Sequence, residues 1–282
     1  MSDARCSELS LASGEPLGAT ATTTREWLLV EVRGGWSREV RGPDALPEPV
    51  HEAIADWLTR TPESRLLFVR RLDRTAGRLL AFRVRADESS AEVRRLELDR
   101  LEDLVRLELA VAGEPSALPL VLVCGHGSRD PCCARRGTAA FRALVPVLGE
   151  EQLWLSSHQG GHRFAANVLV LPAGLQLGRV EPGDAPRVIG AALGGRIVLS
   201  SYRGRTWYER PVQAAELATR TAAALDGVDD LRLIDVEGAR VRFRDRNGSD
   251  HAAVVEEDVG PVVPASCDGE PEPQTVFTAR VV

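Results

Sequence analysis

The ten-residue segment CGHGSRDPCC runs from Cys124 to Cys133 and determines how the rest of the chain is interpreted. It follows the apolar run LPLVLV at residues 118–123, which is typical of a buried central strand. Two glycines and a proline inside the segment allow the backbone to curl tightly around a bound group. The segment therefore indicates a ligand-binding loop at the end of a strand.

A second segment, HQGGHRFAAN, runs from His158 to Asn167 and again follows a short predicted strand, at residues 153–156. The two glycines between His158 and His162 disfavour a helix interior and allow a loop to turn both imidazoles towards one point. Two thiolates and two imidazoles form a four-ligand set for zinc or for an iron–sulfur cluster.

The spacing of these ligand types does not by itself separate the two possibilities. A zinc finger also carries two cysteines and two histidines, but only two to four residues usually separate its cysteines. Eight residues separate Cys124 from Cys133, within a large predicted α/β unit. A loop of this width suits a cluster of several atoms better than a single zinc ion.

Three stretches of the sequence resemble the sucrase/ferredoxin-like family, whose members are thioredoxin-like 2Fe–2S ferredoxins. They are CGHGSRDPCCARRG at residues 124–137, HQGGHRFAANVLVLPAGLQLGR at residues 158–179 and YRGR at residues 202–205. The similarity is close over residues 118–210 and weaker over residues 27–33. The tail beyond residue 221 contributes nothing to it.

The resemblance implies that Cys124 and Cys133 bind one iron of a 2Fe–2S cluster, and that His158 and His162 bind the other. The expected function is one-electron transfer with a separate redox partner protein, as reductase or acceptor. We expect an electron carrier rather than an enzyme, since no carboxylate pair argues for sucrose hydrolysis. Imidazole ligands should raise the reduction potential, to a range of about −150 to +300 mV, and make it fall as the pH rises.

Three residues of the two segments could donate hydrogen bonds near the cluster: His126, Arg163 and Asn167. A solvent-facing position is the competing interpretation for His126, and surface or strand positions compete for the other two. Further along the chain, Arg203 and Arg205 could form a docking patch or be ordinary surface residues.

Cys132 leaves other functions open. It could replace Cys133 as a ligand, or serve as the thiol of a thiol or small-molecule reductase. A structural zinc site in an interaction protein and a protein that transfers iron or clusters are further alternatives. Cys6 and Cys267 lie in the polar ends of the chain and are expected to be free thiols.

The composition of the 282 residues, 44% hydrophobic and 27% charged, is that of a globular protein. All 35 basic residues are arginine, which excludes Schiff-base chemistry and lysine-dependent phosphate loops. A net charge of −6 argues against nucleic-acid binding. The five cysteines are an odd number, which argues against a disulfide framework. No run approaches the ~20 apolar residues of a membrane span, and the N-terminus does not read as a signal peptide. We therefore expect no membrane partner and a cytoplasmic location, while the oligomeric state is not indicated.

The sequence predicts an α/β protein with four parts. These are a flexible arm (1–24), an N-terminal α/β region (25–115), a thioredoxin-like ferredoxin domain (116–225) and a small β-rich extension (226–282). Strands are predicted at residues 26–33, 66–70, 78–85, 118–123, 153–156, 167–172, 196–200, 231–235, 240–244 and 252–256. Helices are predicted at residues 50–60, 101–110, 134–148, 185–193 and 211–225. Asn247-Gly248 predicts a hairpin turn.

Overall fold

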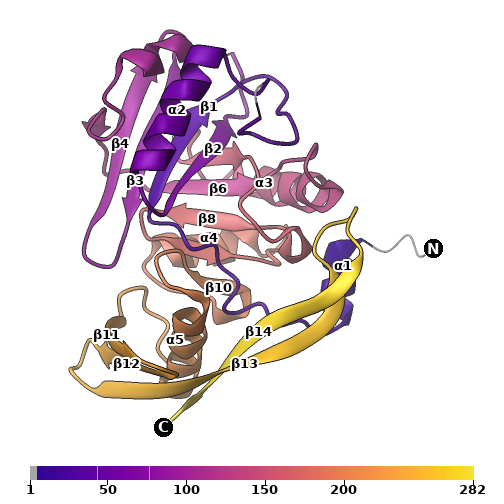
Figure 1. Cartoon of the computed structure of the whole chain (residues 1–282), viewed down its shortest axis with the longest axis vertical. Helices are drawn as coiled ribbons and strands as arrows, with labels where there is room; N and C mark the ends of the chain where they lie inside the picture. The colour runs from indigo at the N-terminus through magenta and orange to yellow at the C-terminus, as the bar shows by residue number, and fades with distance from the viewer. Residues whose placement is uncertain (1–4, 43, 76) are drawn as a thin grey trace.

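A computed structural model describes residues 5–42, 44–75 and 77–282 (Figure 1). It confirms the α/β class, with one large mixed sheet and a separate small antiparallel sheet near the C-terminus. The strands of the large sheet are β1 (Glu26–Glu31), β2 (Ser64–Arg70), β3 (Leu79–Ala86), β4 (Ala91–Leu98), β5 (Glu114–Pro115), β6 (Leu120–Cys124), β7 (Leu153–Ser156), β8 (Val168–Leu171), β9 (Leu175–Leu177) and β10 (Tyr202–Arg205).

Helices flank the sheet and connect its strands. The α-helices are α1 (Cys6–Ala12), α2 (Glu48–Arg60), α3 (Thr138–Leu144), α4 (Ala185–Leu193) and α5 (Arg210–Ala223). The short helical turns are η1 (Leu101–Arg106), η2 (Cys133–Gly137), η3 (His162–Phe164) and η4 (Leu199–Ser201). Within the described residues, none of these helices is long and apolar enough to cross a membrane.

Strands β6 to β9 form the thioredoxin-like part of the sheet. Strands β6 and β7 are parallel and connected through α3, as a βαβ unit requires. Strand β8 then pairs antiparallel with β6, and β9 pairs antiparallel with β8. The resulting order, β9-β8-β6-β7, places the ends of β6 and β7 side by side. The loops that carry the cysteines and histidines leave the sheet at these two ends.

The predicted N-terminal region and the predicted ferredoxin domain share this one sheet. Strand β2 pairs antiparallel with β7, with Val69 opposite Ser156. Beyond β2 the order continues β1-β3-β4-β5. The boundary between residues 25–115 and 116–225 stays a prediction, and hydrogen-bonded strands cross it.

Both faces of the central strands are buried, which explains their unbroken apolar runs. In β1, Leu28 and Val30 belong to one apolar cluster, whereas Trp27 and Leu29 belong to a second cluster. Alternate residues of a strand point to opposite faces, so the sheet lies between two core layers. Burying each such side chain contributes about 1.5–3 kcal/mol.

The tail forms the small sheet, in the order β11-β12-β13-β14. Its strands are β11 (Leu231–Glu237), β12 (Arg240–Asp245), β13 (Asp250–Pro264) and β14 (Pro271–Val281). Asn247 and Gly248 lie in the turn between β12 and β13, which confirms the predicted hairpin. The sequence did not predict β14 or the full length of β13. These two strands form a long hairpin that extends past α5 to helix α1 (Figure 1).

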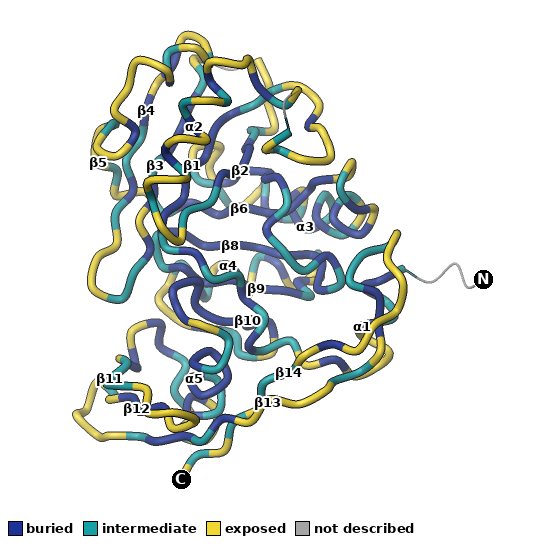
Figure 2. Tube along the Cα trace, in the orientation of Figure 1, coloured by how far each residue is buried: buried dark blue, intermediate teal, exposed yellow. Residues whose placement is uncertain are grey.

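The N-terminal segment differs from the flexible arm expected at residues 1–24. Among its described residues, 5–24, helix α1 forms and several residues are buried (Figure 2). The backbone N–H groups of Ala21 and Thr22 donate to the amide oxygens of Gln213 and Gln176, at 3.0 and 2.6 Å. Backbone hydrogen bonds to buried side-chain amides therefore hold this segment in place, and a hydrophobic pattern does not reveal such bonds.

Other local predictions were wrong or incomplete. Residues 196–200 are not a strand of either sheet: Ile197 donates to Asp226 O at 2.6 Å, and η4 follows. Only η1 forms within the helix expected at residues 101–110. Strands β4, β9 and β10 were missed because they are charged or very short.

Candidate metal centre

Cys124 is the last residue of β6, and the loop that follows it folds back against the end of this strand. Gly137 packs against this point, where a Cβ atom would lie 1.8 Å from the carbonyl oxygen of Cys124. Only glycine permits this approach, which brings η2 and its first residue, Cys133, back against the strand end. The backbone N–H of Cys124 donates to Asn167 O at 3.0 Å, so β8 also holds the strand end in place.

The structure brings the four predicted ligands together. One ligand atom from each of Cys124, Cys133 and His158 lies within 4.8 Å of the other two. The Cys133 sulfur lies 3.6 Å from Nδ1 of His162. The two imidazole rings are stacked, with centroids 3.8 Å apart and planes inclined by 14°. Gly161, with φ of 72°, provides the left-handed turn just before His162.

The electrostatics of the group favour metal binding. The Cys133 thiol, followed by the His158 ring, holds the pKa of Cys124 well below its usual value. The same contact with Cys124, together with burial, raises the pKa of Cys133. Burial and the neighbouring His158 lower the pKa of His162 to about 4. One sulfur is thus disposed to be a thiolate and His162 to be neutral, which are the forms that bind metals.

One observation fits this donor set to a bound metal group. Nδ1 of His158 is buried, yet it has no hydrogen-bond partner among the described residues. Buried polar atoms are normally paired, and a metal ion is one partner that resolves an orphaned ring nitrogen. Two soft sulfur donors and two imidazoles suit zinc or iron and not a hard cation such as Mg²⁺.

His126 positions one of the histidines rather than facing solvent. It is 1% exposed, and its Nδ1 accepts the backbone N–H of His158 at 3.2 Å. Its Nε2 lies 2.9 Å from Ser37 O, so this nitrogen carries the proton. Burial lowers the pKa of His126, which keeps the ring neutral for this arrangement.

Asn167 holds the turn between the two histidines. Its side-chain amide donates to Gly161 O at 2.8 Å, and its Oδ1 accepts a hydrogen bond from Arg203 at 2.8 Å. Arg163, in contrast, pairs with the buried carboxylate of Glu15 at 2.7 Å and so anchors the N-terminal segment. The roles predicted near the cluster for Asn167 and Arg163 stay predictions. Of these two side chains, that of Asn167 bonds to the backbone between the histidines.

Sequence reasoning missed two cations beside the site. Arg203 is only 2% exposed and donates to Gly160 O at 3.0 Å, so it is neither a docking nor a surface residue. The half-buried Arg65 donates to His158 O at 2.8 Å. Burial lowers the pKa of Arg203 to about 9, and the charge of Cys124 opposes this shift. The YRGR motif was the available signal for Arg203, whereas nothing in the sequence singled out Arg65.

The site opens to solvent on the side of His158. A concave region of about 400 Å³ is lined there by His158, His126 and several arginines. Of these arginines, Arg38 pairs with Asp268 and Arg129 pairs with Glu39. His158 is therefore the predicted ligand that a partner molecule reaches most directly.

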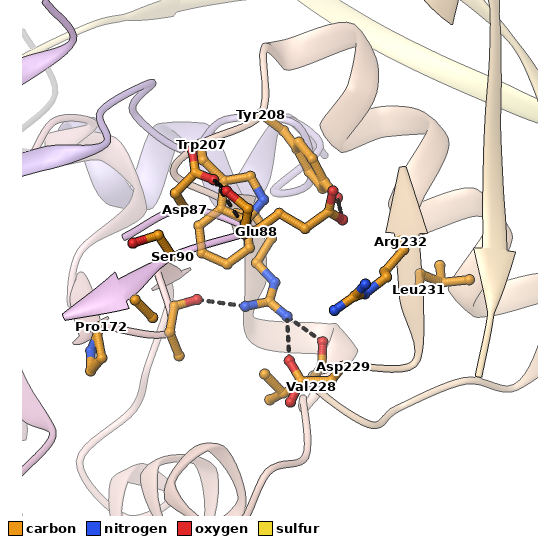
Figure 3. A pocket seen from close by; sticks show the side chains of 14 residues that line it. Asp87, Glu88, Ser90, Pro172, Trp207, Tyr208, Val228, Asp229, Leu231 and Arg232 are labelled. Carbon is orange, nitrogen blue, oxygen red and sulfur yellow. Dashed lines mark hydrogen bonds and ion pairs between the residues drawn. The ribbon is translucent and has the colours of Figure 1, made fainter. Parts of the chain in front are cut away.

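A second concave region, of about 380 Å³, lies between the β3–β4 turn and residues 228–232 (Figure 3). Two of its polar side chains are already paired: Tyr208 donates to Glu88 at 2.5 Å, and Arg205 donates to Ala173 O at 2.6 Å. Arg205 is buried like Arg203 and is not a surface residue.

Comparison with known proteins places the chain in a family. The model of the sucrase/ferredoxin-like family matches residues 17–204, which is more than half of the chain. The chain belongs to the sucrase/ferredoxin-like family. The matched range contains all four predicted ligands, whereas α5 and the small sheet lie outside it.

Relatives match over shorter stretches. Altered inheritance of mitochondria protein 32 from Meyerozyma guilliermondii is 36% identical over 95 residues, 30% of this chain and 34% of that protein. The protein of the same name from Eremothecium gossypii is 33% identical over 106 residues, 33% of this chain and 34% of that protein. The chain thus spans about a third of the length of the curated relatives it matches. Their name refers to mitochondria, and the cytoplasmic location of this chain stays a prediction.

Among solved structures, the chain is similar to a thioredoxin-like [2Fe-2S] ferredoxin from Aquifex aeolicus. The identity is 19% and the TM-score 0.28, over 33% of this chain and 97% of that chain. The thioredoxin-like assignment given above rests on the strand order β9-β8-β6-β7 and on the family match.

Proposed function

We propose that this protein is a one-electron carrier that holds a 2Fe–2S cluster through Cys124, Cys133, His158 and His162. The observation that carries the proposal is the meeting of two thiols and two imidazoles from separate loops, with the buried Nδ1 of His158 left without a hydrogen-bond partner. When bound, such a cluster accepts and releases a single electron, at a potential tuned by its ligands.

The surrounding residues of the chain tune and hold the site. His126 and Asn167 orient the histidine loop through hydrogen bonds to its backbone. Arg65 and Arg203 place positive charge beside the ligands, which favours the more negative, reduced state. Glycines 160 and 161 let the loop turn, because both have positive φ angles.

The electron exchanges with a separate protein. The sequence has no Gly-x-Gly-x-x-Gly motif after a predicted strand, so a nicotinamide or flavin fingerprint of its own is missing. The concave region lined by His158 is the place where we expect a redox partner to dock. A reductase that uses Cys132 as its thiol is disfavoured, since this residue is only 1% exposed.

The decisive experiment is anaerobic purification followed by iron, acid-labile sulfide and zinc assays, with visible spectra before and after dithionite. Two irons and two sulfides per chain, with colour that bleaches on reduction, are expected. The Cys124→Ser variant should lose both, whereas Ser128→Ala in the same loop should keep them. One zinc held by the four ligands, without sulfide or colour, would overturn the electron-transfer proposal and leave a structural metal site in an interaction protein.

A further inference from the structure

Three cysteines that are far apart in the chain meet in a second cluster. Cys6 begins α1, Cys132 precedes Cys133 in the ligand loop, and Cys267 lies at the tip of the β13–β14 hairpin. The sulfur–sulfur distances are 3.6 Å for Cys6–Cys132, 3.4 Å for Cys132–Cys267 and 3.5 Å for Cys267–Cys6. Cys6 and Cys267 were expected as isolated thiols in polar ends, but the long hairpin carries Cys267 to α1 (Figure 1).

Asp130 completes the cluster as a fourth donor. Its carboxylate oxygens lie 3.4 Å from the Cys267 sulfur and 3.9 Å from the Cys6 sulfur. They also accept the backbone N–H groups of Cys132 and Cys267, at 2.7 and 2.8 Å. These two bonds orient the carboxylate and leave lone pairs directed at the thiols. Cys6, Cys132 and Asp130 are each 1% exposed.

The distances match the edges of a coordination tetrahedron. Tetrahedral zinc with Zn–S bonds of about 2.3 Å requires its sulfur ligands to lie about 3.8 Å apart. The three sulfur–sulfur distances of 3.4–3.6 Å come close to this value without any movement of the backbone. A disulfide needs about 2.05 Å between two sulfurs and would leave the third thiol unpaired.

The buried carboxylate of Asp130 also favours a bound cation. Three thiols and a carboxylate are gathered in a largely buried position, and no arginine or histidine among the described residues forms an ion pair with Asp130. Buried anionic groups are costly unless they are paired or bind a metal. The Ser7 hydroxyl approaches the Cys132 sulfur at 3.2 Å, which suits a thiolate there. A thiophilic divalent ion would bind the carboxylate and the sulfurs together, and the thiols would release their protons to solvent as the ion binds.

We propose that Cys6, Cys132, Cys267 and Asp130 form a second metal site, which holds one tetrahedral divalent ion of the zinc class. The ion ties α1 and the hairpin tip to the loop that supplies Cys133. Cys6 and Cys267 lie outside the range 17–204 that matches the family, whereas Asp130 and Cys132 lie within it. It is independent of the cluster proposed at Cys124 and its partners.

The first test measures zinc and iron together in the intact protein. Wild-type protein purified with zinc present and then treated with a weak chelator should keep one zinc per chain. The Cys6→Ser/Cys267→Ser double variant should lose that zinc and retain the iron, sulfide and visible spectrum of the wild type. Ser7→Ala is the matched control, because it removes a contact of Cys132 but no ligand, and it should keep zinc. Absence of zinc from the wild type, or equal zinc in the double variant, would overturn the proposal.

A second test removes the first metal centre, so that the two proposals fail separately. In a Cys124→Ser/Cys133→Ser background, titration with Co²⁺ should give the intense visible absorption of tetrahedral cobalt thiolate, saturating at one equivalent. Adding Cys267→Ser should abolish this absorption. If the background variant gives no such absorption while circular dichroism shows that it is folded, the second site does not exist. This result would not count against the separate proposal that the wild-type protein binds a 2Fe–2S cluster through Cys124.

Discussion

Cys132 and Cys133 are adjacent in the chain, yet their sulfur atoms lie in different clusters. The Cys132 sulfur is 3.6 Å from that of Cys6, whereas the Cys133 sulfur is 3.6 Å from Nδ1 of His162. Cys132 already has helical backbone angles, with φ of −63° and ψ of −42°. Consecutive helical residues project about 100° apart, so one turn of chain can supply two separate sites.

This separation predicts opposite outcomes for two neighbouring substitutions. Cys133→Ser should abolish iron and sulfide binding, because it removes a ligand of the proposed 2Fe–2S cluster. Cys132→Ser should keep the iron and lose the zinc of the second site. Metal and sulfide assays on both variants decide the matter, and loss of iron from Cys132→Ser alone would reverse the assignment of the two thiols.

Arg203 should raise the reduction potential of the proposed cluster. A buried positive charge favours the reduced state, so Arg203→Gln should lower the potential by on the order of tens of mV. Arg163→Gln provides the control, since that guanidinium is already neutralised by Glu15 at 2.7 Å. Spectroelectrochemical titration measures both variants. Equal potentials in the two variants would show that the charge of Arg203 does not act on the site.

The sequence predicted that the two loops would meet, because both segments follow apolar strands and place glycine where the loops must turn. It also predicted β1, α2, α4 and α5 closely, because these elements have long periodic patterns. It failed where the deciding partner is distant in sequence. Nothing near Cys6 or Cys267 shows that a hairpin of two long strands will bring them together. The backbone of Ala21 and Thr22 is held by Gln213 and Gln176, which no local pattern reveals.

Asn167 should control how long a cluster stays bound. It joins Gly161 O to Arg203, and it is fully buried. Removing a group that orients metal ligands costs about 10- to 100-fold in metal affinity. Asn167→Ala should therefore lose visible colour faster than the wild type in the presence of an iron chelator. Asn247→Ala, in the exposed β12–β13 turn, should match the wild type, and an unchanged rate for Asn167→Ala would contradict the role.

The reduction potential should depend on pH if imidazoles bind the iron. Reduction adds negative charge, which raises the pKa of the outer imidazole nitrogen and favours proton uptake. Raising the pH removes that proton and disfavours the reduced state, so the potential falls, by at most about 59 mV per pH unit for one electron and one proton. A His158→Cys/His162→Cys variant should have a lower and flatter potential. A wild-type potential that is flat from about pH 6 to 10 would count against imidazole ligation.

Removal of the divalent ion from the second site should make α1 and the hairpin tip more mobile, while the proposed 2Fe–2S cluster stays bound. Helix α1 has only seven residues, too few to be stable alone, and its first residue packs against Cys132, Ala165 and Cys267. Treatment with a zinc chelator should therefore increase amide hydrogen exchange in residues 6–12 and 265–270, whereas β6 stays protected. The Cys6→Ser/Cys267→Ser variant should already exchange at this faster rate and show no further change with chelator. Protection of α1 that is equal in chelated and zinc-loaded wild type would mean that contacts other than the metal hold the two ends of the chain together.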